Sequence, residues 1–206
     1  MKVRLLLLAV IVVVLAAPTA QSAPAKRGTA PVIDLATGPV DGAWSALVRT
    51  SSGLSMTFHT SGLPAREAFT VWFVVFNNPA ACTAPIAGLT NCGEADLFDP
   101  AVEAAVFRAG GHVIGTSGPT TISGSVKVGQ TRNALTFPDG TAPFTTLMNP
   151  LTAEVHLVAL RHGAWVPASP EMFHTFWACS LPPGPGVNEL GCADWQVSIH
   201  LPPSTA

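Results

Sequence analysis

Glu154 and His156, in the stretch EVHLVALRH, have the residue types and the spacing to hold a metal ion. Side chains two apart on a strand share a face and lie about 7 Å apart, within reach of one divalent ion such as zinc, copper or calcium. His59, His200 and His112 are further candidate ligands, and the five residues would form one site if their strands were neighbours. The alternative, which we favour, is that His59 and His200 are solvated and that His156 is hydrogen-bonded within the sheet.

The tryptophans offer a different chemistry, stacking against a sugar ring. The chain has five tryptophans and no tyrosine. Trp72 and Trp195 fall on apolar strand faces, where packing in the core is the simplest role. Trp165 is the tryptophan we expect to be exposed, and with the nearby His162 it is the candidate ligand-binding pair. In a straight strand His162 lies roughly 20 Å from His156, too far to share a metal ion with it.

A third cluster is acidic: Glu94, Asp96, Asp99 and Glu103 are four carboxylates within ten residues. Calcium prefers such oxygen-rich loops, but the spacing does not match the twelve-residue helix–loop–helix pattern. We therefore expect these residues to cap and solvate a connection. The familiar catalytic signatures GxSxG and HExxH, the P-loop and the glycine-rich dinucleotide fingerprint are absent from the sequence. The sequence thus argues against an enzyme more than for one.

The four cysteines, Cys82, Cys92, Cys179 and Cys192, predict disulfides in an exported chain. Three connectivities exist for four cysteines, and the spacing favours the two local pairs, Cys82–Cys92 and Cys179–Cys192. Each short loop would contribute roughly 2–3 kcal/mol in the chain-entropy account. The chain contains no CxxC motif, which disfavours a structural zinc site.

The start of the chain has the pattern of a secretory signal peptide. Lys2 and Arg4 precede an apolar run, Leu5–Ala17, which is too short to span a bilayer comfortably. Ala23-Pro24-Ala25 fits a small-x-small cleavage site, and a cut after Ala20 is the alternative. No later apolar run is long and uniform enough for a transmembrane anchor in the mature chain.

These features divide the chain into a signal peptide, residues 1–25, and one domain, residues 26–206, that is secreted or periplasmic. Without Lys2 and Arg4, the 10 basic and 12 acidic residues become 8 against 12, a net charge of −4 with neutral histidines. That balance excludes the basic surface that nucleic-acid binding needs. Only 11% of residues are charged, while there are 18 glycines and 19 prolines, which indicates many turns and short strands.

The stretch AFTVWFVVFNN, residues 68–78, should form the central strand that other elements cover. Aromatic and β-branched residues dominate it, and it is apolar on both faces, so both faces must be packed. The competing interpretation is a buried helix. Residues 101–109 fit a strand and a short helix equally well. Further strands are expected at residues 32–37, 44–50, 54–60, 110–115, 121–128, 153–161, 172–178 and 195–201.

Alternation along the last of these strands separates an apolar face from a polar one. The apolar face would carry Trp195, Val197, Ile199 and Leu201, and the polar face Gln196, Ser198 and His200. Short strands, frequent turns and no convincing long helix predict a mostly-β fold. We expect an antiparallel β-sandwich or Greek-key barrel, in a single domain stapled by disulfides.

Two stretches resemble bacterial chordin-type (CHRD) domains, which are secreted β-sandwiches. GLSMTFHTSGL (residues 53–63) is similar to that family's strand with a Ser/Thr-Gly-Leu turn, and FTTLMNPLTAEVHLVALRHG (residues 144–163) to its late strand. The family's His-Ile-His segment is replaced here by VWFVVFNN, so a metal role does not carry over from it. The architecture also looks like that of copper/zinc superoxide dismutase, but the absence of His-x-His disfavours that activity.

The sequence therefore predicts an exported soluble β-sandwich domain with a binding or structural role and an unknown extracellular ligand or protein partner. One alternative is a metal-binding or metal-dependent protein that uses the Glu154/His156 cluster. Another is a carbohydrate-binding module that uses Trp165 and His162.

Overall fold

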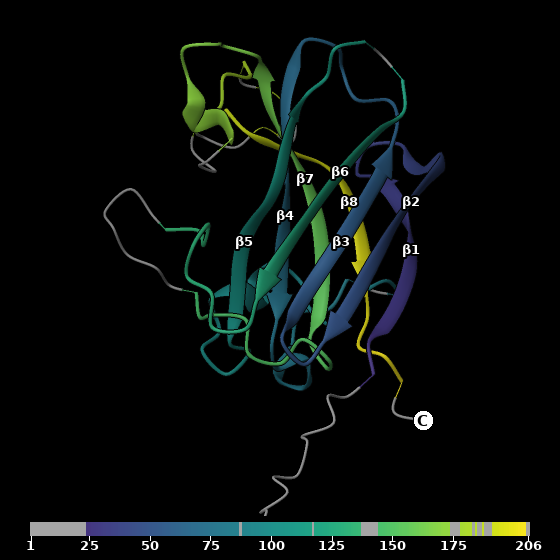
Figure 1. The fold of residues 1–206 in the computed structure, drawn as a ribbon, viewed down its shortest axis with the longest axis vertical. Helices are drawn as coiled ribbons and strands as arrows, with labels where there is room; N and C mark the ends of the chain where they lie inside the picture. Colours follow the sequence, from purple (N-terminus) through teal and green to yellow (C-terminus); the bar gives the residue numbers. More distant parts are fainter. Residues whose placement is uncertain are drawn as a thin grey trace, which may run out of the picture.

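The computed structural model describes residues 24–86, 88–116, 118–136, 144–173, 178–182, 184, 187 and 191–204. Eight antiparallel strands form one sheet in the order β5-β4-β7-β8-β1-β2-β3-β6, curled into a nearly closed barrel (Figure 1). The strands are β1 (Lys26–Asp34), β2 (Gly38–Thr50), β3 (Gly53–Thr60), β4 (Glu67–Phe76), β5 (Ala104–Val113), β6 (Thr120–Lys127), β7 (Glu154–Ala164) and β8 (Ala193–His200). The described residues form only three helices, all short 3-10 turns: η1 (Pro79–Ala81), η2 (Glu94–Phe98) and η3 (Pro170–Phe173). The predicted mostly-β antiparallel fold is confirmed.

The barrel nearly closes where β5 and β6, the two edge strands of the sheet, approach each other. A Cβ built on Gly124 of β6 would lie 2.4 Å from the carbonyl oxygen of Ala109 in β5, and one on Gly110 would lie 2.9 Å from the carbonyl oxygen of Ser123. Such close backbone approach requires glycine. These glycines therefore let the two edges shield each other.

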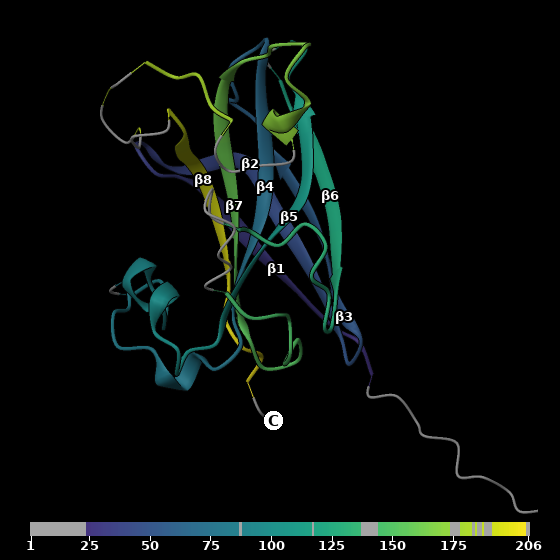
Figure 2. The same cartoon turned by 90° about the vertical axis from the view of Figure 1, so that its left-hand side faces the viewer.

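β4 is the central strand that its composition predicts, paired with β5 on one side and β7 on the other. Its inward residues Val71, Phe73 and Val75 are fully buried in the barrel core. Its outward residues are buried as well: Trp72 in a cluster with Leu160 and the Cys179–Cys192 disulfide, and Phe76 beneath the long connection that joins β4 to β5. Figure 2 shows this connection, with η1 and η2, standing off the sheet beside β7 and β8. Both faces of β4 are therefore covered, by different layers.

The structure extends or corrects three of the expected elements. The first strand, expected at residues 32–37, begins at Lys26, and residues 26–29 pair with β2. Residues 101–109, for which strand and helix fit equally, enter β5 at Ala104 after a turn. The strand predicted at residues 172–178 is wrong at its start, which belongs to η3, while residues 174–177 lie outside the described residues.

The polar face of β8 points into the barrel rather than toward solvent. Gln196, Ser198 and His200 are at most 5% exposed. Ser45 on the facing side of β2 lies 2.6 Å from the Ser198 hydroxyl and 2.7 Å from His200 Nε2, so that the buried polar atoms are hydrogen-bonded. Burial, helped by the positive charge of Arg49, lowers the pKa of His200 to about 4. The expectation that His200 is solvated is therefore wrong.

Arg49 closes one end of the barrel from the inner face of β2. Only 4% of its surface is exposed, and its guanidinium donates to the carbonyl oxygens of Pro150, Ala153 and His200 at 2.7–3.0 Å. Burial lowers the pKa of Arg49 to about 10, an effect that the charge of Glu154 opposes. The fork of donors thus ties the start of β7 and the end of β8 to β2.

Both predicted disulfides are confirmed, Cys82–Cys92 in the β4–β5 connection and Cys179–Cys192 in the connection that leads to β8. The predicted signal peptide lies outside the described residues except for its last two positions. No helix in the described part of the chain is long and apolar enough to span a membrane.

Candidate functional site

A pocket of about 480 Å³ lies between the outer face of the sheet and the β4–β5 connection. We call the described residues of this connection from 79 to 98, which leave out residue 87, the roof segment. The sheet side of the pocket is lined by Ile33, Leu35, Trp72, Val74, Phe76, Val106, His156, Val158, Asp194, Val197 and Ile199. The other side is lined by Ile86, Leu89, Gly93, Glu94, Leu97 and Phe98 of the roof segment, together with Leu135 and Phe144. Apolar side chains therefore form nearly all of the wall.

Strand alternation forms the floor of the pocket. Val74, Val158 and Val197 occupy outward positions on β4, β7 and β8, while the residues between them point into the barrel. Val158 pairs directly with Val197, while Val74 lies opposite His156, two residues along β7 from Val158, so the three valines form one patch on the outer face. Each is only partly buried, so the pocket leaves apolar floor uncovered.

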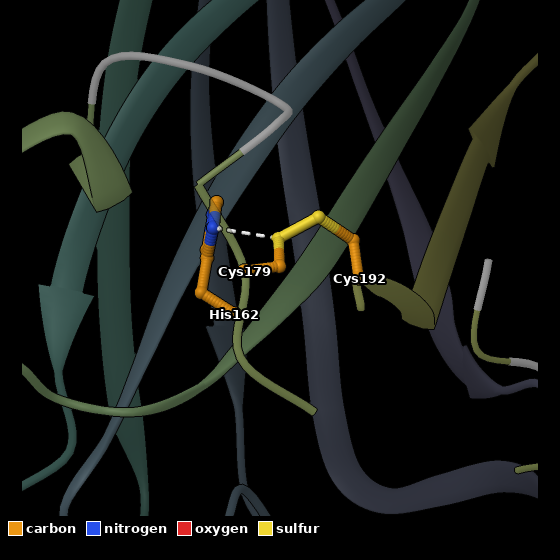
Figure 3. A group of neighbouring side chains, drawn as sticks. All are labelled: His162, Cys179 and Cys192. Carbon is orange, nitrogen blue, oxygen red and sulfur yellow. Dashed lines mark hydrogen bonds between the residues drawn. A yellow bond between two sulfur atoms is a disulfide. The ribbon is translucent and has the colours of Figure 1, made fainter. Parts of the chain in front are cut away.

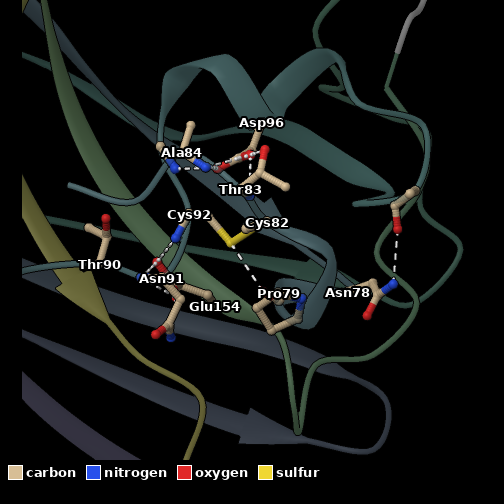
Figure 4. The surroundings of a disulfide bond; sticks show 12 residues. Asn78, Pro79, Cys82, Thr83, Ala84, Thr90, Asn91, Cys92, Asp96 and Glu154 are labelled. Carbon is tan, nitrogen blue, oxygen red and sulfur yellow. Dashed lines mark hydrogen bonds between the residues drawn. A yellow bond between two sulfur atoms is a disulfide. The ribbon is translucent and has the colours of Figure 1, made fainter. Parts of the chain in front are cut away.

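The roof segment is held in shape from within. The Cys82–Cys92 disulfide closes it, and the buried carboxylate of Asp96 accepts hydrogen bonds from the backbone N–H groups of Thr83 at 2.8 Å and Gly93 at 2.9 Å (Figure 4). Burial opposes ionisation of Asp96, but these backbone donors lower its pKa. Asp96 therefore caps the connection, which is the role expected for this acidic cluster.

Glu154 fastens the roof segment to the sheet. It begins β7, is fully buried, and accepts hydrogen bonds from the backbone of Asn91 and Cys92 and from the Asn91 side chain (Figure 4). It also accepts a hydrogen bond from His156 Nε2 at 2.8 Å. Burial alone would raise the pKa of Glu154. The hydrogen bonds from His156, Cys92 and Asn91 outweigh this effect, and the pKa is lower than its ordinary value. A carboxylate has about four lone-pair sites, and these donors use them.

The predicted metal ligands occupy separate places. Glu154 and His156 lie together, as their spacing predicts, on the outer face of β7. His200 points into the barrel; His59 of β3 is hydrogen-bonded to Thr121 at 2.9 Å and stacks on Trp44; His112 is exposed on β5. No three of the five predicted residues, all of which the structure describes, offer ligand atoms within 4.8 Å of one another.

His162 lies in a buried chain of hydrogen bonds. Trp72 Nε1–H donates to Thr70 Oγ1, whose hydroxyl lies 2.8 Å from His162 Nε2, while His162 Nδ1 lies 3.1 Å from the carbonyl oxygen of Ala178. That carbonyl can only accept, so Nδ1 carries the proton and Nε2 accepts from Thr70. Burial lowers the pKa of His162 to about 4, against the bond to Ala178, and the ring stays neutral.

The same histidine lies against the second disulfide. His162 Nδ1 is 3.2 Å from Sγ of Cys179, which is bonded to Cys192 (Figure 3). These three residues and the set Cys82, Cys92 and Asp96 are the two groups in the described chain whose ligand atoms cluster closely enough to share an ion. In both groups the sulfurs are already joined as disulfides, and a disulfide lacks the thiolates that bind metal.

Trp165, the tryptophan expected to be exposed, is half-buried in the structure. Its ring centroid lies 4.9 Å from that of Phe173. Among the described tryptophans, Trp44 is the exposed one, at 42% of its surface, and its ring stacks on His59 at 5.5 Å. Trp72 lines the pocket, and Trp195 lies under the guanidinium of Arg161. The structure therefore separates the predicted pair: His162 is fully buried and Trp165 packs against η3.

Three polar groups face the pocket: Asp194 from β8, Glu94 from η2 and His156 from β7. Sequence pattern singled out two of them for other roles, His156 as a metal ligand and Glu94 as part of the acidic cluster. Asp194 was not singled out. The Asp194 side chain is exposed where the pocket meets solvent, yet the protein atoms packed around its carboxylate, together with the negative charge of Glu94, raise its pKa to about 6. No lysine or arginine is among the described residues that line the pocket. The site is therefore an apolar cavity with an acidic end.

No protein-family model, no curated protein and no solved structure matches this chain.

Proposed function

We propose that this protein is an exported binding protein that holds a small apolar molecule between the outer face of its barrel and the roof segment. The observation that carries the proposal is the pocket of about 480 Å³, walled by apolar side chains from both layers. Small-molecule sites occupy about 300–1,000 Å³ and are mostly apolar with a few polar groups. Removal of the ligand's apolar surface from water would supply the binding free energy.

Exposed apolar surface gathers around this pocket. The described chain has eight exposed large hydrophobic residues, and four of them line it: Leu35, Ile86, Leu89 and Phe98. Scattered single hydrophobic residues are ordinary on a protein surface, whereas a cluster marks a binding site. Three of the four belong to the roof segment, which is stapled by a disulfide and pinned by Glu154. A pocket with a fixed roof is pre-organised, which lowers the entropy cost of binding.

A metal-dependent function is the weaker proposal. The buried donors around Glu154 leave little of its carboxylate for an ion, and the other predicted ligands lie elsewhere in the fold. A sugar-binding function through Trp165 is weaker too, because this ring packs on Phe173. The resemblance of residues 53–63 and 144–163 to chordin-type domains suits a secreted β-protein but names no ligand.

The proposed export rests on the signal-peptide pattern of residues 1–25 and on the two disulfides, which persist in oxidising compartments. β1 begins at Lys26, one residue beyond the expected cleavage site, so cleavage there would leave the sheet whole. We propose a secreted or periplasmic location on these grounds.

The test is titration of the purified mature chain with N-phenyl-1-naphthylamine, an uncharged probe whose emission rises in apolar surroundings. Val158→Trp and Val197→Trp each place an indole on the pocket floor and should weaken binding about tenfold. The matched control is Val128→Trp, because Val128 is 43% exposed and does not line the pocket. Thermal unfolding of each variant checks that it is folded.

Saturable binding that both floor variants weaken and the control does not is the expected result. Absence of saturable binding to the folded wild-type chain would contradict the proposal. Equal binding by all four proteins would also contradict it, because the probe would then lie outside the pocket.

A further inference from the structure

We propose that the molecule bound in the pocket is a cationic amphiphile, an apolar body that carries a protonated amine, with its ammonium group between Asp194 and Glu94. This inference rests on the proposed function, since it names the chemical class of the ligand for the same pocket.

A β-bulge places Asp194 in the pocket. β8 pairs with β7 through Ala159 opposite Gln196 and then through Leu160 opposite Asp194, so the register skips Trp195. Gln196 points into the barrel, and in a regular strand Asp194 would point the same way. The extra residue reverses this, and Asp194 lines the outer pocket together with Val197. Bulges commonly re-aim a side chain at a functional site.

Glu94 approaches the same end from the opposite wall. It is the first residue of η2 in the roof segment, which the Cys82–Cys92 disulfide and Asp96 hold in place. Both carboxylates line the same cavity, Glu94 from the roof segment and Asp194 from the sheet, and the negative charge of Glu94 helps to raise the pKa of Asp194. Both side chains are exposed, so two layers of the structure present carboxylates where the apolar cavity meets solvent.

These carboxylates lack a counter-charge within the described chain. Neither Asp194 nor Glu94 forms a side-chain hydrogen bond or ion pair with a described residue, and no described lysine or arginine lines the pocket. The remaining ionisable group of the wall is His156, which is bonded to Glu154. The other carboxylates of the roof and of β7 differ, because Asp96 and Glu154 are saturated with donors.

Charge complementarity then selects the ligand. A carboxylate or phosphate beside Asp194 and Glu94 would meet two like charges, while a neutral ligand would gain nothing from these exposed carboxylates. An ammonium group donates up to three hydrogen bonds and pairs with both carboxylates, and such charge-assisted bonds are stronger in apolar surroundings. The alkyl body would cover the valines of the floor, which are partly open.

The test compares octylamine, 1-octanol and octanoate, which share a chain length and differ in head-group charge at pH 7. Each is measured by calorimetry on the mature chain and by displacement of the uncharged probe. The wild-type chain should bind octylamine about tenfold more tightly than 1-octanol, with octanoate weakest. In Asp194→Asn and in the double variant Asp194→Asn/Glu94→Gln, the ratio of amine to alcohol affinity should fall to within about twofold. Asp41→Asn removes an exposed carboxylate on β2, outside the pocket, and is the charge control.

The outcomes separate this inference from the proposed function. Binding of the uncharged probe and of 1-octanol without a preference for the amine would overturn the inference and leave the proposed function intact. Failure of the probe and all three octyl ligands to bind would overturn both. A preference that persists in the double variant would place the amine elsewhere and would also overturn the inference. A preference reduced by Asp194→Asn and not by Asp41→Asn would support it.

Discussion

Replacement of Glu154 by glutamine tests whether this buried carboxylate is the anchor of the roof segment. The substitution keeps the size of the side chain and removes its charge. Four donor groups point at the carboxylate: the Asn91 backbone and side chain, the Cys92 backbone, and His156 Nε2. Glutamine keeps one acceptor oxygen, so at least one of these donors would face an NH₂ group instead.

The magnitude follows from the loss of charge. A hydrogen bond to a charged group contributes about 1.5–3 kcal/mol and a neutral one about 0.5–1.5 kcal/mol, so each of the bonds weakens by ~1 kcal/mol. The substitution also removes the free-energy cost of burying an ionised group, and this gain offsets part of the loss from the weaker hydrogen bonds. We expect Glu154→Gln to lower the free energy of unfolding at pH 7 by about 2–3 kcal/mol. That loss corresponds to a melting temperature lower by roughly 5–10 °C for a chain of this size.

The pH dependence gives the sharper readout. Because the pKa of Glu154 is below its ordinary value of 4.5 in the folded chain, its contribution is complete above that value and is lost as the pH falls through the lower, folded pKa. The stability gap between wild type and Glu154→Gln should therefore be full at pH 7 and shrink below about pH 4.

Urea unfolding of both proteins at pH 7 and pH 2.5, with Asp41→Asn as the control for loss of an exposed carboxylate, measures this gap. The reasoning is refuted if Glu154→Gln costs no more than Asp41→Asn, or if the gap is the same at both pH values.

Two further substitutions test other parts of the structure. Gly124→Ala should destabilise the chain by about 1–3 kcal/mol, because its Cβ would lie 2.4 Å from the Ala109 carbonyl oxygen, while Gly115→Ala, with nothing within 4 Å, should cost little. Equal urea midpoints for the two variants would contradict the close approach of β5 and β6. Asp194→Asn should stabilise the chain at pH 7 and not at pH 4. With a pKa raised from 3.8 to about 6, the folded chain holds a proton that the unfolded chain has released, so wild-type stability falls as the pH rises through this window. Parallel stability curves for wild type and variant across the window would argue against this environment for Asp194.

Much of the fold follows from local pattern. The two-faced apolar stretch of β4 and the clean alternation of residues 54–60 predict strands, and the strands are where the pattern puts them. The cysteine spacing likewise favours the disulfides that form. These signals are local, since they depend on residues a few positions apart in the chain.

The faces of β8 show where local pattern fails. Alternation assigns Gln196, Ser198 and His200 to one face, which is correct, but their polarity suggests solvent, and they point inward. They are stable there because partners distant in sequence, such as Ser45 and Thr60, supply the hydrogen bonds. Whether a polar face finds such partners depends on which strands are neighbours, and periodicity does not encode this.

The meeting of Asp194 and Glu94 in one pocket could not be predicted from local pattern either, because it depends on which segments become neighbours in the fold. Asp194 reaches the outer face only through a change of register between β7 and β8, and Glu94 meets it only because the roof segment folds over the sheet. The prediction that Glu154 and His156 lie together is a matter of two positions on one strand, and it holds. Glu154 anchors the roof segment through hydrogen bonds from Asn91 and Cys92, which lie more than sixty residues away in the chain. Local pattern does not reveal such distant partners.

The two faces of β4 bear on function as well as on fold. A strand that is apolar on both sides is explained by packing alone if both sides are fully buried, and the inner residues Val71, Phe73 and Val75 are. On the outer side Trp72 and Phe76 are also buried, but Val74 between them remains partly open and lines the pocket. A second core layer would have closed over Val74, since protein interiors pack to high density. A disulfide and Glu154 instead fix the roof segment in place, and a cavity remains above Val74, which is the space that the proposed binding function requires.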